Sequence, residues 1–198
     1  MGAVLLGAAA AAIGTPTGVS GGLLLLPLLL TVFGLGGTVA SATNLLFNIV
    51  STPAGVLRQV RRGQLDPALT WLLVVSAAPA AVFGALLNVF LLGLGGAVLA
   101  APAALLLTRW PVSRISGAAL VGTLTVSLTG LASYALLDAA GRTSVNTPDW
   151  PLGLALGAGG VLGAYAGVRF AGRIPDRLLR TTLAVVVAFG AARLVLAG

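Results

Sequence analysis

Long apolar runs alternate along the chain with short breaks that hold charged or turn-forming residues. The runs cover residues 1–33, 38–57, 67–92, 94–108, 115–137, 150–171 and 181–197. A membrane-spanning helix needs about 20 largely apolar residues, and in hydrocarbon only helices or closed barrels satisfy the backbone. The pattern therefore predicts an all-α, polytopic membrane protein with six or seven passes.

The first apolar run contains a glycine-rich interruption. The run is too long for one pass and too short for two, and residues 14–22 in its middle read Gly-Thr-Pro-Thr-Gly-Val-Ser-Gly-Gly. This pattern predicts a broken or re-entrant helix. A secretory signal peptide over residues 1–13 is the competing interpretation, but it lacks a basic n-region and the apolar pattern continues past any cleavage site.

The chain carries an internal repeat. A shift of 75 positions places Gly18-Val-Ser-Gly-Gly22 and Pro27 on Gly93-Leu-Gly-Gly-Ala97 and Pro102. The same shift pairs Ser41 with Ser116, Leu45 with Leu120, Asn48 with Thr123, Thr52 with Ser127 and Gly55 with Gly130, and after an insertion Asp66 pairs with Asp149 and Gly84 with Gly167. Chance matching of small residues is the alternative, but the ordered series favours two repeat halves, residues 1–92 and 93–198, as in many transporters.

Charges in the breaks indicate that the second half is inverted. The break after the second run holds Arg58, Arg61 and Arg62 against Asp66, whereas the equivalent break near 138–149 holds Arg142 against Asp138 and Asp149. Cytoplasmic loops accumulate Arg and Lys, so equivalent loops of opposite bias lie on opposite sides of the membrane. We expect residues 58–66 and 172–180 on the cytoplasmic side and residues 138–149 outside.

Composition removes several classes of chemistry. Hydrophobic residues make up 58% of the chain and charged residues 8%, with no His and no Cys. Zinc, haem and iron–sulfur ligation require His or thiolate, so we expect no metal, no cofactor and no enzyme of those kinds. The net charge of +7 comes from Arg in short breaks between apolar runs, which argues against nucleic acid and for a lipid bilayer as partner.

The two glycine-rich breaks are candidate anion sites. A break inside a spanning helix exposes backbone N–H groups at the start of the next half-helix, where the macrodipole adds positive charge. The first break presents the amides of Ser20, Gly21 and Gly22, and the second presents those of Gly95, Gly96 and Ala97. Alternatively, these glycines only permit close helix crossings.

A polar stripe follows each break. Its members in the first half are Ser41, Asn44, Asn48, Ser51 and Gly55, and in the second half Ser116, Thr123, Ser127, Gly130 and Tyr134. Spacings of three and four put each set on one helix face, which should turn inward because buried polar groups are costly in lipid. Asn44, Asn48, Ser51, Thr123 and Ser127 are therefore candidates for substrate binding. Interhelical hydrogen bonding is the alternative for Asn44 and Asn48.

Acidic side chains are absent from the middle of every predicted run, because each of the four Asp residues lies in or beside a predicted loop. A cationic substrate would lack a counter-charge there, whereas an anion would find amides and hydroxyls. The sequence therefore favours a small anionic substrate.

With these motifs in hand, the chain resembles the sulfite exporter TauE/SafE family of membrane anion permeases. The resemblance rests on the paired glycine-rich signatures at 18–27 and 93–102, on residues 42–48 leading into 58–66, on 117–123, and on 148–153 followed by 159–167. It implies export of sulfite or a related sulfonate across a bacterial inner membrane by a multi-pass protein. Members of the family usually close the first half with a further span and loop, which this chain lacks. Either the chain is a compact relative, or residues are absent, in which case a chain discontinuity near residues 90–93 is expected.

The leading hypothesis is thus a transporter with two inverted halves that carries a small oxyanion by alternating access. The rival hypothesis is a membrane scaffold or assembly subunit that binds partner helices and transports nothing. A lipid-active membrane enzyme is less favoured because catalytic side chains are scarce. The sequence is compatible with a monomer and with a homo-oligomer.

Overall fold

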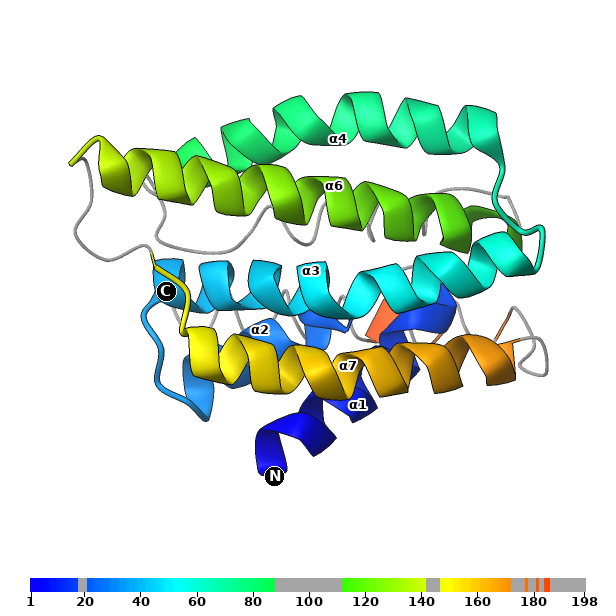
Figure 1. Ribbon diagram of the computed structural model, residues 1–198, viewed down its shortest axis with the longest axis horizontal. Coiled ribbons are helices and arrows are strands. Elements are labelled where there is room, and N and C mark those ends of the chain that lie inside the picture. The colour runs from blue at the N-terminus through cyan, green and yellow to red at the C-terminus, as the bar shows by residue number, and fades with distance from the viewer. Residues whose placement is uncertain are drawn as a thin grey trace.

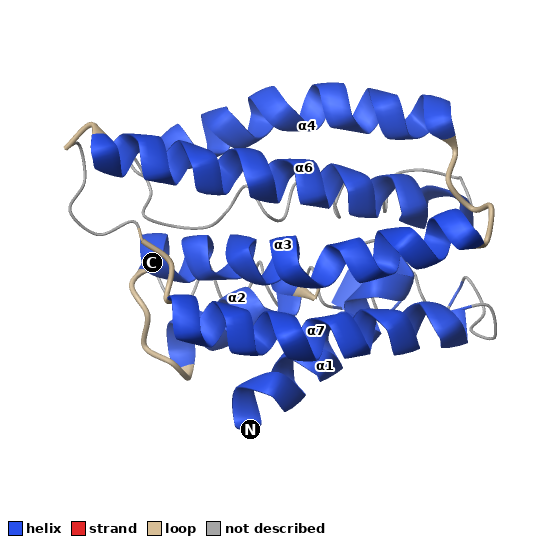
Figure 2. Ribbon diagram, in the orientation of Figure 1, coloured by secondary structure: helices blue, strands red, loops and turns tan. Residues whose placement is uncertain are grey.

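The computed structural model describes residues 1–17, 21–87, 112–141 and 147–171, together with the single positions 177, 181, 184 and 185. The elements in order are α1 (Gly2–Gly14), the 3₁₀ turn η1 (Thr15–Thr17), α2 (Gly22–Thr31), α3 (Gly37–Arg61), α4 (Pro67–Leu87), α6 (Val112–Ala139) and α7 (Trp150–Ala171). All regular structure in the described residues is helical, which confirms the predicted all-α fold class (Figure 2). The runs expected at 94–108 and 181–197, and the discontinuity expected near 90–93, lie outside the continuous described segments.

The long helices pack side by side as a bundle. Helix α3 lies between α6 and α7, α4 packs on α6, and α1 packs on α7 (Figure 1). Helices α3 and α7 run in one direction across the bundle, and α4 and α6 run in the opposite direction (Figure 1). Within the described residues, two helices, Ser116–Ala139 and Trp150–Arg169, are long and apolar enough to cross a membrane.

The first predicted run folds as two short helices joined by a break. Helix α1 has 13 residues and α2 has 10, so at about 1.5 Å per residue neither reaches across a hydrocarbon core. A Cβ atom added to Gly21 would lie 2.5 Å from the backbone of Ala10 and Ala11. The chain therefore folds back onto α1 where α2 begins, which confirms the expected broken helix.

Glycines on two faces of α7 allow it to approach two neighbours closely. The first face meets backbone carbonyls of α1, and its pairs are Gly159 with Val4, Gly163 with Ala8 and Gly167 with Ala12. The second face meets side chains of α3, and its pairs are Gly153 with Leu46, Gly157 with Val50 and Gly160 with Phe47 and Ser51. Small residues are the usual means of packing helices in lipid, where little hydrophobic driving force acts between them.

Helices α4 and α7, which the predicted repeat pairs with each other, each begin with an aspartate cap. Asp66 Oδ1 accepts a hydrogen bond from the backbone N–H of Ala68 at 3.1 Å, at the start of α4. Asp149 Oδ1 accepts one from Leu152 N–H at 3.0 Å, at the start of α7. An Asp side chain at this position satisfies amides that have no partner within the helix. Asp66 and Asp149, which the repeat alignment pairs, thus both cap the start of a helix.

Glycines in a left-handed conformation end α3 and α6. Gly63 follows α3 with φ of +63°, and Gly141 follows α6 with φ of +65°. After α3, Gly63 N–H donates to Val60 O and Gln64 N–H donates to Gln59 O, which is the Schellman arrangement. These terminations set the ends of the long helices, and α3 extends past the predicted residue 57 to Arg61.

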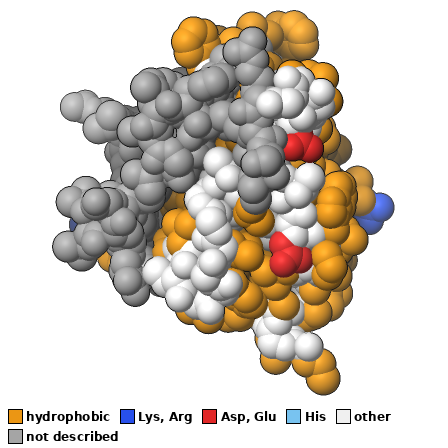
Figure 3. All heavy atoms as spheres, turned by 90° about the vertical axis from the view of Figure 1, so that its left-hand side faces the viewer, with side chains coloured by type: hydrophobic (Ala, Val, Ile, Leu, Met, Phe, Trp, Pro, Cys, Tyr) orange, Lys and Arg blue, Asp and Glu red, His pale blue; other side chains and the backbone are white. Residues whose placement is uncertain are grey.

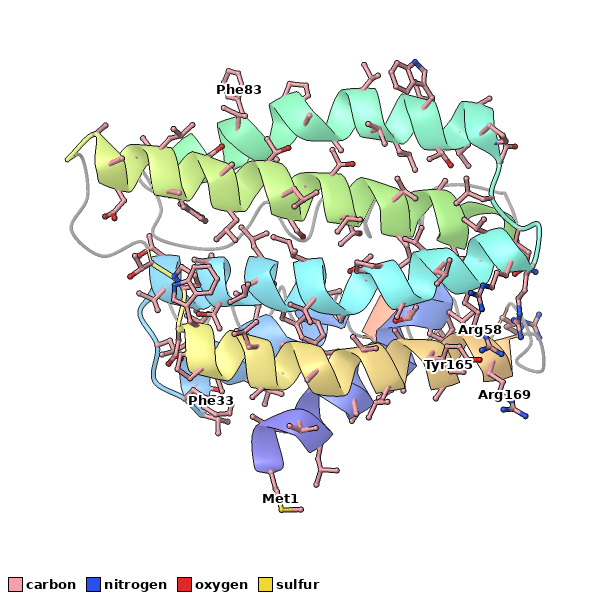
Figure 4. All side chains as sticks on the ribbon, viewed as in Figure 1. Met1, Phe33, Arg58, Phe83, Tyr165 and Arg169 are labelled. Atoms are coloured by element: carbon pink, nitrogen blue, oxygen red, sulfur yellow. The ribbon has the colours of Figure 1, made fainter. Side chains whose placement is uncertain are left out.

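Among the described residues, arginines gather at one end of the bundle, together with Asp66, and the other end carries Asp138 and Asp149. Arg58 and Arg169 lie at one end (Figure 4), and Asp138 and Asp149 lie at the other, where α6 ends and α7 begins (Figure 1). A view onto this second end shows acidic side chains on its surface (Figure 3). The described parts of the breaks at 58–66 and 138–149, which were predicted to lie on opposite sides of the membrane, therefore lie at opposite ends of the bundle. The break at 172–180 lies outside the described residues except for position 177.

Candidate functional site at the crossing of α3 and α6

Helices α3 and α6 cross through two reciprocal leucine–glycine contacts. A Cβ on Gly130 of α6 would lie 3.0 Å from Leu45 Cδ1 of α3, and a Cβ on Gly55 of α3 would lie 3.2 Å from Leu120 Cδ1 of α6. The sequence shift of 75 positions pairs these two leucines with each other and these two glycines with each other. Each contact is therefore the counterpart of the other under the predicted repeat.

A hydrogen bond extends the same register. Gln59 Nε2 donates to Ser116 Oγ at 2.8 Å, and both side chains are buried. From Leu45 through Gly55 to Gln59, each step along α3 is matched by an equal step backward along α6. The helices are thus antiparallel and in regular contact over most of their length.

Polar side chains occupy the middle of this crossing. The register places Asn48 opposite Ser127 and Thr52 opposite Thr123, between the two leucine–glycine contacts. Asn48, Thr52 and Ser127 are all buried. A polar centre is thus enclosed between apolar contacts on either side, as the polar stripes predicted.

Two hydroxyls in this centre lack the hydrogen bond that many helical hydroxyls make. Ser and Thr inside helices commonly donate to the carbonyl four residues back, and the described hydroxyls that do so are Thr31, Thr43, Thr70, Ser76, Thr123, Thr125, Ser133 and Thr181. Thr52 Oγ1 and Ser127 Oγ make no hydrogen bond in the described protein although the side chains are 2% and 0% exposed. A buried hydroxyl without a partner is costly, so both are available to a bound group.

The helix break meets two asparagines of α3. A Cβ on Gly22, the first residue of α2, would lie 2.7 Å from Asn44 Oδ1 and 2.6 Å from Asn48 Oδ1. Gly22 and Asn48 each have an interaction partner in the structure. Asn44 is 0% exposed, and neither its Nδ2 nor its Oδ1 makes a hydrogen bond with the described residues. Of the two asparagines beside the start of α2, Asn44 is thus the one whose side-chain amide group makes no hydrogen bond with the described residues.

At the arginine end of the bundle, the Arg62 side chain links the end of α3 to backbone carbonyls of α7. Arg62 Nη1 donates to Val168 O at 2.6 Å, and Arg62 Nη2 donates to Arg169 O at 3.4 Å. The positive charge of Arg62 beside the last carbonyls of α7 is also stabilised by the negative end of the α7 helix dipole. The Arg58 guanidinium lies 4.0 Å from the centre of the Tyr165 ring (Figure 4), so Arg58 rests on an aromatic face.

The sequence-predicted site residues divide into three groups. Ser20, Gly95, Gly96 and Ala97 lie outside the described residues. Asn44 and Asn48 flank Gly22, and the register puts Thr123 and Ser127 at the crossing with Asn48. Gly21 packs on α1, and Ser51 packs on Gly160 of α7.

Thr52 is the residue that the site prediction missed. Its neighbour Ser51 was chosen because it fits the stripe of three- and four-residue spacings. Thr52, however, lies in helical spacing with Leu45, Gly55 and Gln59, which contact α6. The repeat alignment, which pairs Thr52 with Ser127, was the signal that could have identified it. Within the described residues, no group of three or more acidic, His or Cys side chains could hold a metal ion.

Comparison with known proteins identifies the family. The profile of the family described as sulfite exporter TauE/SafE matches residues 3–92 and 89–194. No curated protein and no solved structure matches the chain. The matched segments cover nearly the whole sequence, and they include the α3–α6 crossing and the helix break. The chain therefore belongs to the sulfite exporter TauE/SafE family of membrane transporters.

Proposed function

We propose that this protein is a permease that exports a small anion, such as sulfite or an organosulfonate, across a bacterial inner membrane. The observation that carries the proposal is the fully buried Asn44, whose Oδ1 lies beside the first residue of α2 and whose Nδ2 has no hydrogen-bond partner in the described protein. An amide N–H and a helix N-terminus both attract negative charge. Family membership in a sulfite exporter family supports the same substrate class.

The available chemistry at the centre suits an anion better than a cation. The unpaired donors of the crossing and of the helix break are the hydroxyls of Thr52 and Ser127 and the Nδ2 of Asn44. Asn44 Oδ1 and Gln59 Oε1 are unpaired acceptors, and Arg58 Nε is a further unpaired donor, at the arginine end. No Asp lies inside the described helix centres, since Asp66, Asp138 and Asp149 lie at helix ends. Neutral donors can bind an anion without the desolvation cost of a buried opposite charge.

The arrangement of helices supports transport by alternating access through two inverted halves, residues 1–92 and 93–198. The repeat pairs α3 with α6 and α4 with α7, and the observed contacts α3–α7 and α6–α4 are exchanged by that pairing. Helices paired by the repeat run in opposite directions (Figure 1). Inverted repeats of this kind commonly expose one central site to each side in turn.

In this scheme the two leucine–glycine contacts act as gates. Leu120 and Gly55 lie on the arginine side of the polar centre, and Leu45 and Gly130 lie on the acidic side. The arginine side faces the cytoplasm by the positive-inside rule. Opening one contact while the other stays closed would admit the anion from one side only.

Flux into sealed vesicles tests the proposal. We expect purified protein in liposomes to carry radiolabelled sulfite or a sulfonate down its gradient, and Asn44→Asp to reduce the initial rate at least tenfold, because a carboxylate replaces the donor. The matched control is Gln64→Glu, the same amide-to-acid change on an exposed loop residue, which should keep the wild-type rate. Absence of flux in wild-type vesicles, with the protein correctly inserted, would favour the scaffold hypothesis.

A further inference from the structure

Thr52 and Ser127 form a pair that the packing of the bundle leaves unused. They are equivalent under the repeat, they lie on facing helices, and each is at least nine-tenths buried. Their hydroxyl oxygens have no hydrogen-bond partner in the described protein. On the same two helices, Thr43 Oγ1 donates to Val39 O at 2.7 Å and Ser133 Oγ donates to Thr129 O at 2.8 Å.

The position of the pair in the crossing is set by the register. The two leucine–glycine contacts centre the crossing on Val50 of α3 and Thr125 of α6. Thr52 and Ser127 each lie two residues beyond these centres, in opposite directions because the helices are antiparallel. At about 1.5 Å per residue the pair is separated by roughly 6 Å along the helix axes.

That separation suits a ligand that accepts hydrogen bonds at two different atoms. Hydrogen bonds from a hydroxyl to an anionic oxygen are about 2.6 Å long, so two of them, together with the ion between them, can span an axial offset of about 6 Å. Two hydroxyls from opposite helices can then reach two oxygens of the same ion. Both residues keep their protons, because a neutral hydroxyl binds an anion as a donor.

We propose that Thr52 and Ser127 each donate a hydrogen bond to a different oxygen of one bound oxyanion and so determine its affinity. The inference rests on the proposed permease function and adds to it a site of two symmetry-equivalent hydroxyls at the centre of the two halves. An ion held in this way contacts α3 and α6 equally. It therefore stays bound while the gate on either side opens.

Transport kinetics with sulfite test the pair. Thr52→Val and Ser127→Ala should each raise the KM for sulfite about tenfold with little change in kcat, because each loses a hydrogen bond to a charged ligand. Thr52→Ser keeps the hydroxyl and should restore the wild-type KM. Ser133→Ala, which removes a hydroxyl already bound to a carbonyl, is the matched control and should also keep the wild-type KM.

A binding measurement makes the test independent of transport. Sulfite should raise the melting temperature of the detergent-solubilised wild type and of Ser133→Ala, and should raise it less for Thr52→Val and Ser127→Ala. Wild-type flux with unchanged KM and thermal shift in both variants would overturn the hydroxyl pair while leaving the permease function intact. Absence of sulfonate and sulfite flux in the wild type would instead refute the function on which the pair depends.

Discussion

Replacing Asn44 with alanine separates a binding role from a structural role by the sign of its effect on stability. The side chain is 0% exposed and neither of its polar atoms makes a hydrogen bond with the described residues. An unpaired buried polar group destabilises a fold by about 1–3 kcal/mol. Removing the amide relieves that cost, whereas removing a hydrogen-bonded amide would add to it.

The magnitude follows from two opposing terms. Truncation to alanine leaves a small cavity that costs on the order of 1 kcal/mol, at about 24 cal/mol per Å³. Relief of the unpaired amide offsets this, so Asn44→Ala should be neutral or stabilising by up to about 2 kcal/mol. Since 1 kcal/mol shifts the Tm of a chain of this size by about 2–4 °C, the expected Tm lies between the wild-type value and about 8 °C above it.

Asn48→Ala supplies the matched comparison one helical turn away. Asn48 has an interaction partner in the structure, so its truncation loses that interaction as well as leaving a cavity. We expect a loss of roughly 2–3 kcal/mol, or a Tm about 4–12 °C below the wild type.

Thermal unfolding in detergent, followed by tryptophan fluorescence, gives both Tm values, and vesicle flux gives activity. Asn44→Ala should combine a Tm at or above the wild-type value with a sulfite rate reduced at least tenfold. A Tm that falls as far as that of Asn48→Ala, with flux retained, would falsify the binding role and show that Asn44 serves helix packing.

Three further predictions concern packing and topology. Gly163→Ala should lower the Tm by several degrees, because its Cβ would collide with a backbone carbonyl of α1, whereas Gly122→Ala on α6, whose Cβ would meet only Leu73 Cβ at 3.5 Å, should leave the Tm unchanged or higher; equal Tm values would contradict the close α1–α7 contact. Arg62→Met should cost about 1–2 kcal/mol in denaturant or thermal unfolding, since it removes the donors to the last carbonyls of α7; an unchanged Tm would show that these hydrogen bonds contribute nothing. Because the chain has no native cysteine, an impermeant maleimide applied from outside should label Thr147→Cys and spare Gln64→Cys. Labelling of both variants would contradict the predicted placement of these two loops on opposite sides of the membrane.

The sequence by itself determined the helical class and the break after the first helix. Hydrocarbon imposes these two features, because a backbone there must bond within its own helix and breaks must carry turn-forming residues. The repeat also placed Asp66 and Asp149 at equivalent helix starts, where both cap their helices. Such features depend on local chemistry and on residue order, both of which a sequence displays.

Only the tertiary structure decided which polar groups are left without partners. Ser127 and Ser133 lie on the same helix, yet Ser133 bonds to its own helix and Ser127 does not. The choice between Ser51 and Thr52 depends on how α3 is rotated between three neighbours, since adjacent residues on a helix face directions about 100° apart. Ser51 meets α7, and Thr52 falls on the stripe that meets α6. Which helix lies against each face of α3 is decided when the bundle assembles, and the spacing of polar residues along the sequence does not specify it.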